Sequence, residues 1–110
     1  MTTAGDQKAV VCFGEMLLRL SPPIGVPLSR AGSLNLAVGG AEANVAIALS
    51  GLGRPARMLT VLPDNALGRR AISSLGEAGV DTAYVSQAPG RLGLYFFEPP
   101  SGPVGGRVTY

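Results

Sequence analysis

The chain has 110 residues, which is enough for one domain at most. A hydrophobic content of 46% with only 15% charged residues predicts a folded protein and excludes an intrinsically disordered one. The net charge of +2 argues against nucleic-acid binding, because the arginines are scattered rather than clustered. With one cysteine and no histidine, the sequence excludes an internal disulfide and a His/Cys zinc site, and we expect no metal ligands.

The sequence shows no targeting or membrane-spanning segment. Its first residues, MTTAGDQKAV, lack the apolar core of a signal peptide. No apolar run approaches the ~18 residues that a membrane span needs. We therefore expect a cytoplasmic protein with no membrane partner.

The first half of the chain indicates two strands, a further apolar segment and a helix. The apolar run AVVCFG (9–14) predicts a strand buried on both faces, as in a parallel sheet, with Cys12 as a small buried side chain. Residues 16–22 continue apolar and stop at a Ser-Pro-Pro sequence, and residues 33–38 alternate like a half-buried strand. A helix follows at about 41–52. The residues expected on its apolar stripe are Val45, Ala48, Leu49 and Leu52.

The second half continues the alternation of strands and helices. Residues 56–63 predict another buried strand, and residues 64–80 a second helix, for which Asp64 is either the N-cap or a ligand group. Its apolar stripe consists of Leu67, Ala71, Ile72 and Leu75, while Gly68 weakens the first turn. Residues 82–86 predict a brief strand.

The end of the chain predicts a β-hairpin with a long Pro/Gly/Ser connection, formed by residues 92–98 and 107–110. The whole pattern is that of an α/β fold. Strands buried on both faces need more than two covering helices. We therefore expect residues 1–110 to be the N-terminal part of a larger domain.

The stretch AVGGAEANVA combines two glycines with a polar residue one helical turn later. Gly39 and Gly40 can bring the backbone against a ligand, and the helix that follows directs its N–H groups to the same place. Asn44 both donates and accepts hydrogen bonds, which suits a hydroxyl group. The alternative is a strand-to-helix turn that needs glycine, with Asn44 in solvent. Glu15 is likewise either a carboxylate at the rim of this pocket or a solvated charge.

Two segments of the sequence, GGAEANVAIALSGLG and LPDNALG, resemble the N-terminal signature of the PfkB (ribokinase-like) sugar kinases. Glu42 and Pro63 depart from it, since many members have Pro and Gly at these positions. Together with GEMLLRLSPP and GLYFFEPPSGPVGGRVTY, the sequence is most similar to the 2-dehydro-3-deoxygluconate kinase branch. The likeness runs over nearly the whole chain.

The resemblance implies the N-terminal portion of a Rossmann-like ribokinase fold with a small β-sheet lid, and it implies that the ATP-binding half lies outside this chain. The lid strands would lie near 16–22, 33–38, 92–98 and 107–110. The substrate-binding residues that it implies are Gly39, Gly40, Asn44, Tyr95 and Tyr110. For Arg107, solvent or a contact between lids is expected.

The implied activity is transfer of the γ-phosphoryl group of ATP, with Mg²⁺, to a hydroxyl of a sugar or sugar acid. The G-A-G-D motif that supplies the catalytic base in this family is absent, so no catalytic residue is assigned. Alone, the chain is expected to be inactive and to bind neither ATP nor Mg²⁺. A kinase of a neutral sugar (ribokinase- or fructokinase-like) and a truncated, non-catalytic sugar-binding module remain alternatives, and a homo-oligomer formed through the lid is left open.

Overall fold

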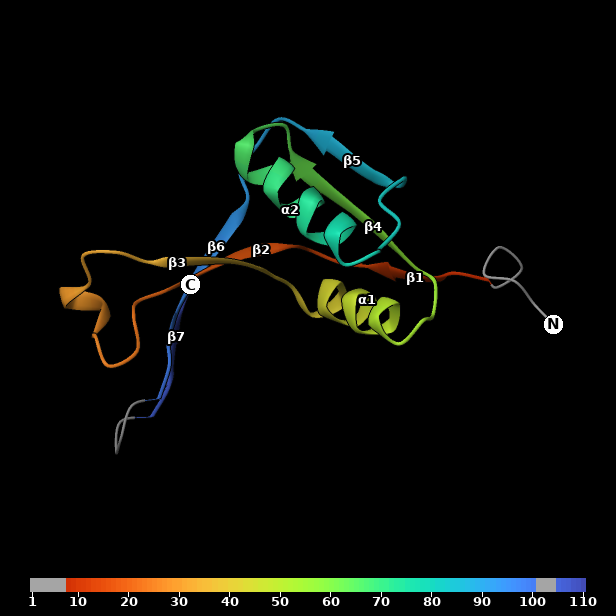
Figure 1. Ribbon diagram of the computed structural model, residues 1–110. Coiled ribbons are helices and arrows are strands. Elements are labelled where there is room, and N and C mark those ends of the chain that lie inside the picture. The colour runs from red at the N-terminus through yellow and green to blue at the C-terminus, as the bar shows by residue number, and fades with distance from the viewer. Residues whose placement is uncertain (1–7, 101–104) are drawn as a thin grey trace.

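The computed structural model describes residues 8–100 and 105–110, which form two β-sheets and two α-helices (Figure 1). The first sheet is parallel and has the order β1-β4-β5. The second has the order β3-β2-β6-β7, with β2 parallel to β6 and the other neighbours antiparallel. The α/β class expected from the sequence is confirmed. The strands are β1 (Val10–Phe13), β2 (Leu17–Ser21), β3 (Asn35–Gly39), β4 (Ala56–Pro63), β5 (Val85–Ala88), β6 (Gly93–Glu98) and β7 (Arg107–Thr109).

The two sheets are joined end to end. The chain passes from β1 through Gly14, Glu15 and Met16 directly into β2, and Figure 1 shows these two strands running nearly in line. The four-stranded sheet therefore extends from the end of the parallel sheet at which β1 and β4 finish. In parallel α/β sheets, the ends of the strands at their carboxyl side are where ligands bind.

Helix α1 (Ala41–Gly51) packs on β1 and β4 through its small residues. Ala43 and Ala46 are buried, whereas Val45 is 52% and Leu52 84% exposed. The sequence-based apolar stripe is therefore wrong for Val45, Ala48 and Leu52, which are exposed, whereas Leu49 is half-buried against the core. The helix is apolar nearly all round, so residue spacing does not select a face, and the alanines let the helix lie closest to the sheet.

Helix α2 (Ala66–Glu77) begins at Asn65, whose side-chain oxygen accepts a hydrogen bond from the Gly68 amide at 3.0 Å. The prediction of Asp64 as N-cap is wrong, because Asp64 is exposed and lies 3.8 Å from Arg69 in a loose ion pair. Gly68 is buried, and a Cβ there would overlap the carbonyl oxygen of Pro63. This glycine lets the first turn of α2 lie against the end of β4.

The fifth strand begins later in the chain than the sequence predicted, after a contact between Asp81 and Arg57. The Arg57 guanidinium lies 2.8 Å from the Asp81 carboxylate, and residue 81 forms an isolated bridge to β4. The chain then turns, since the Val85 amide donates to the Thr82 carbonyl at 3.0 Å. The strand expected at 82–86 therefore lies at Val85–Ala88.

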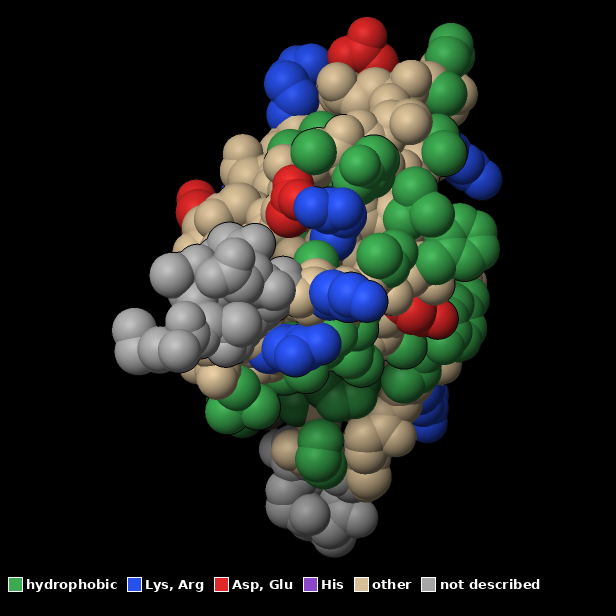
Figure 2. Space-filling view, turned by 90° about the vertical axis from the view of Figure 1, so that its right-hand side faces the viewer, with side chains coloured by type: hydrophobic (Ala, Val, Ile, Leu, Met, Phe, Trp, Pro, Cys, Tyr) green, Lys and Arg blue, Asp and Glu red, His purple; other side chains and the backbone are tan. Residues whose placement is uncertain are grey.

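The face of the parallel sheet away from the helices carries exposed apolar side chains. Phe13 is 72%, Val61 65%, Val11 55% and Leu59 41% exposed, whereas Cys12 in the same strand as Phe13 is buried. Hydrophobic side chains gather on the right-hand side of the view in Figure 2. Burial of these strands on both faces, as the sequence indicated, is thus not found in the described part of the chain. Among the described residues, no helix is long and apolar enough to cross a membrane.

Candidate functional site

The turn at Gly39 and Gly40 brings the start of α1 against the segment between β1 and β2. Gly40 has a φ of 135°, and a Cβ there would lie 2.6 Å from the Glu15 carbonyl oxygen. Any side chain at Gly40 would therefore collide with backbone and strain the turn. The fold itself requires this glycine, whether or not a ligand touches it.

Gly39 is needed for a different reason. It is buried at the end of β3, and a Cβ at this position would lie 3.1 Å from the hydroxyl oxygen of Tyr95. Tyr95 comes from β6, and β2 lies between β6 and β3, so the ring reaches across β2. The Tyr110 ring lies next to the Tyr95 ring, and their centroids are 5.9 Å apart. The structure thus brings three of the five predicted site residues together on one face of the four-stranded sheet.

Asn44 lies in the first turn of α1, where its backbone N–H donates to the Gly40 carbonyl at 2.9 Å. Its side chain is exposed and makes no hydrogen bond to another described residue. This geometry is compatible both with a ligand contact and with the solvent-facing alternative. Asn44 and Gly40 are linked through the helix turn rather than through their side chains.

Two carboxylates lie close to the same junction. The Glu42 carboxylate lies over Gly14, since a Cβ at Gly14 would be 2.5 Å from its carboxyl carbon. A Glu15 carboxylate oxygen lies 3.8 Å from the position of a Cβ at Gly93. Both side chains are exposed, and both lie near the end of β1. A ligand bound here meets negative charge on the side of α1.

Arg19 was not among the residues selected from the sequence, yet it shares the face of Tyr95. Its register partners are Ala37 in β3 and Tyr95 in β6, and paired residues in a sheet direct their side chains to the same side. Strand alternation places Arg19 opposite Leu18 and Leu20, and the sequence contains that signal. The register that sets it beside Tyr95 is visible only in the structure.

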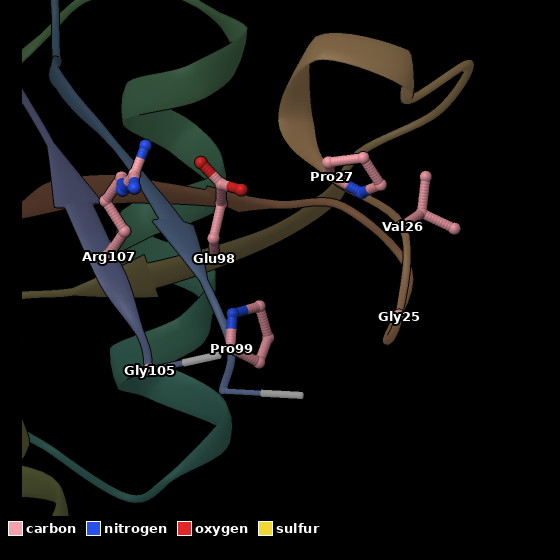
Figure 3. A pocket seen from close by; sticks show the side chains of 7 residues that line it. All are labelled: Gly25, Val26, Pro27, Glu98, Pro99, Gly105 and Arg107. Carbon is pink, nitrogen blue, oxygen red and sulfur yellow. The ribbon is translucent and has the colours of Figure 1, made fainter. Parts of the chain in front are cut away.

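A separate cavity of about 400 Å³ lies at the far end of β6 and β7 (Figure 3). Figure 3 shows Glu98 and Arg107 side by side across it from the loop with Val26 and Pro27. A Glu98 carboxylate oxygen already accepts a hydrogen bond from the Leu28 amide at 3.3 Å, which fastens this loop to the sheet. The cavity contains none of the predicted site residues. Arg107 is exposed on the face opposite Tyr110, since the two positions differ by an odd number along β7.

Among the described residues, no three acidic, histidine or cysteine side chains converge as a metal site. The sequence has neither a P-loop nor a G-A-G-D motif.

Most of the chain is similar to known carbohydrate kinases. The chain is 42% identical over 101 residues to a 2-dehydro-3-deoxygalactonokinase from Haloferax volcanii, covering 92% of this chain and 32% of that protein. It is 42% identical over 95 residues to fructokinase-1 from Oryza sativa subsp. japonica, covering 84% and 29%. The crystal structure of 2-dehydro-3-deoxygluconokinase from Thermotoga maritima matches with a TM-score of 0.91 and 40% identity, covering 94% of this chain and 32% of that one.

The chain spans about a third of the length of these relatives. Residues 7–99 match the family model described as pfkB family carbohydrate kinase. The neighbouring structures have the ribokinase-type fold that the resemblance implied, and both that fold and the family resemblance are confirmed. The chain belongs to the pfkB family of carbohydrate kinases.

Proposed function

We propose that the full-length protein containing this chain is an ATP-dependent sugar-acid kinase of the 2-dehydro-3-deoxygluconokinase type. Two relatives carry names of kinases for 2-dehydro-3-deoxy sugar acids, which supports this substrate class. In this proposal the four-stranded sheet is the lid, and the chain supplies the sugar-binding side. ATP and Mg²⁺ bind residues beyond this chain, so residues 1–110 alone are inactive.

The observation that carries the proposal is the arrangement around Gly39. One sheet face presents the hydroxyl group of Tyr95 next to the backbone of Gly39, and the ring of Tyr110 lies beside that of Tyr95. We propose that these residues, with Gly40 and Asn44, bind the hydroxyl and acid groups of the substrate. Tyrosine hydroxyl and asparagine amide groups suit such a ligand because they donate and accept hydrogen bonds.

The experiment is an assay of ADP release by the purified full-length protein with Mg²⁺·ATP. The test substrates are 2-dehydro-3-deoxygluconate, 2-dehydro-3-deoxygalactonate, fructose and ribose. The proposal expects the highest kcat/KM for one of the two sugar acids. A higher value for fructose or ribose would establish the neutral-sugar alternative, which the similarity to the rice fructokinase supports.

The same assay tests the alternative of a non-catalytic sugar-binding module. A protein that binds a sugar acid but releases no ADP would establish that alternative. We also propose that the lid sheet mediates contact between protomers, supported by the exposed apolar side chain of Leu94 (44%), which lies on the face opposite Tyr95. Light scattering of the full-length protein and of Leu94→Glu tests this, because a monomeric wild type would refute it.

A further inference from the structure

Arg19 occupies a row of side chains that crosses the whole four-stranded sheet. Ala37, Arg19 and Tyr95 are register partners, and the β6–β7 register, extended by one residue, places Tyr110 opposite Tyr95. The row that lies closer to α1 consists of Gly39, Leu17 and Gly93. Because two of its three residues are glycines, this row leaves open space on the sheet face next to Arg19 and Tyr95.

The Tyr95 hydroxyl and Arg19 lie on the same part of this face. To come within 3.1 Å of the Cβ position at Gly39, the Tyr95 ring has to pass over β2 next to Arg19. Tyr110 extends the same surface on the other side of Tyr95. One arginine and two tyrosine side chains are thereby presented on one face of the sheet.

The location of Arg19 argues against the role of a charge that only prevents pairing of the sheet edge with another strand. Charged residues often guard the edge strands of sheets, but β2 is flanked by β3 and β6 on its two sides. Arg19 is exposed. It takes part in neither of the two ion pairs found among the described residues, which are Arg57–Asp81 and Arg69–Asp64. An arginine on an interior strand, with two tyrosines on the same face, suits a planar anion such as a carboxylate.

The carboxylates of Glu15 and Glu42 also favour an anionic group near Arg19, because they repel it from the other end of the site. Glu15 lies on the same face as Arg19, four residues earlier, which corresponds to roughly 13 Å along an extended strand. Glu42 lies on the same side as Glu15, at the start of α1. These two groups repel a carboxylate and accept hydrogen bonds from hydroxyl groups. A sugar acid with its acid group toward Arg19 would therefore direct its hydroxyl groups toward these carboxylates and α1.

We propose that Arg19 binds the carboxylate of the sugar-acid substrate and so selects acids over neutral sugars. This inference rests on the proposed function above. It makes Arg19 a specificity residue, because the contact is to a group that neutral sugars lack. Binding of ATP does not involve it.

The test uses the full-length protein with Arg19→Gln, Arg19→Lys and, as a matched control, Arg54→Gln. Arg54 is exposed in the connection between α1 and β4, away from the sheet face that holds Tyr95. Calorimetry without ATP measures the Kd of 2-dehydro-3-deoxygluconate, and kinetics give KM for this acid, for ATP and for fructose. Loss of a charge-assisted contact predicts about a 10- to 100-fold weaker Kd for the acid in Arg19→Gln. Arg19→Lys restores part of the affinity, and the ATP and fructose constants and Arg54→Gln stay near wild type.

The outcomes separate this inference from the proposed function. A wild type that phosphorylates the sugar acid, with an unchanged Kd in Arg19→Gln, overturns the role of Arg19 alone. Equal losses for acid and fructose also overturn it, since they indicate a structural effect. A wild type that neither binds nor phosphorylates the acid overturns both proposals. If Arg19→Gln does not fold, Arg19→Lys decides, because lysine cannot form the two-pronged contact and an undiminished affinity would refute it.

Discussion

The hydroxyl group of Tyr95 lies beside the place where a side chain at Gly39 would begin. A Cβ at Gly39 would be 3.1 Å from the Tyr95 oxygen and 3.7 Å from the nearest ring carbon. The two residues come from strands that are not neighbours, because β2 lies between them. The absence of a side chain at Gly39 thus sets the position of a hydroxyl group on the candidate substrate face.

Gly39→Ala in the full-length protein should displace this hydroxyl and weaken sugar binding. Overpacking by one methyl group of this kind costs on the order of 1 kcal/mol, equivalent to about a fivefold higher KM for the sugar acid. The φ of Gly39 is not in the left-handed region, so the stability of the protein should change little. Steady-state kinetics with the acid and with ATP measure the effect, and the KM for ATP should stay constant.

The control is the same substitution in a Tyr95→Phe background. Removing the hydroxyl removes the close contact, so Gly39→Ala should then have a much smaller effect. A double-mutant cycle measures this coupling. Equal effects of Gly39→Ala in both backgrounds would show that the contact does not govern binding.

Substitutions at two glycines of α2 should have opposite effects on stability. Gly68→Ala places a methyl group on the Pro63 carbonyl oxygen, whereas a Cβ at Gly76 has no heavy atom within 4 Å. We expect Gly68→Ala to lower the free energy of unfolding by at least ~2 kcal/mol, because α2 has to move away from β4. Gly76→Ala should raise it by about 0.5–1 kcal/mol through helix propensity. Urea unfolding measures both, and similar values for the two variants would contradict the close packing at Gly68.

The first turn of α2 provides a test of the capping residue. Asn65→Ala removes the acceptor for the Gly68 amide and should cost about 1 kcal/mol of stability. Asp64→Ala removes only an exposed carboxylate with a loose ion pair at 3.8 Å, and it should cost a few tenths of that at most. Thermal unfolding of the two variants compares them. A larger loss for Asp64→Ala would restore the sequence-based assignment of the cap.

Stability should depend on pH through Asp81. The backbone amide of Ala83 and the guanidinium of Arg57 hold the pKa of Asp81 below its usual range. This carboxylate therefore stabilises the fold above its unfolded-state pKa of about 3.9, and the contribution disappears as the pH falls through the lower folded-state pKa. In urea unfolding, wild type should exceed Asp81→Asn at neutral pH, and the difference should shrink in acid. A difference that does not vary with pH would exclude this linkage.

Local sequence patterns identified most elements but not all of their faces or ends. Residues 56–63 were expected as a buried strand and form β4 with the same bounds, because a short run of apolar and β-branched residues is a local signal. The buried face of α1 escaped prediction because alanines and larger apolar residues surround the whole helix. Asn65 and Asp64 are both good capping residues, so only the backbone path decides between them. From the sequence, Gly68 was expected to weaken the first turn of α2, because the sequence does not show its close contact with Pro63.

The sequence by itself determined the order of strands and helices, the family and the glycine pair followed by Asn44, because these depend on neighbours in the chain. Tertiary structure alone decided that the Tyr95 hydroxyl lies at Gly39 and that Arg19 stands beside Tyr95. Strands distant in sequence acquire their register from long-range packing and from ladder hydrogen bonds, and a shift of one residue would turn Arg19 to the other face. The candidate site is thus a product of strand register, for which the sequence carries no local signal.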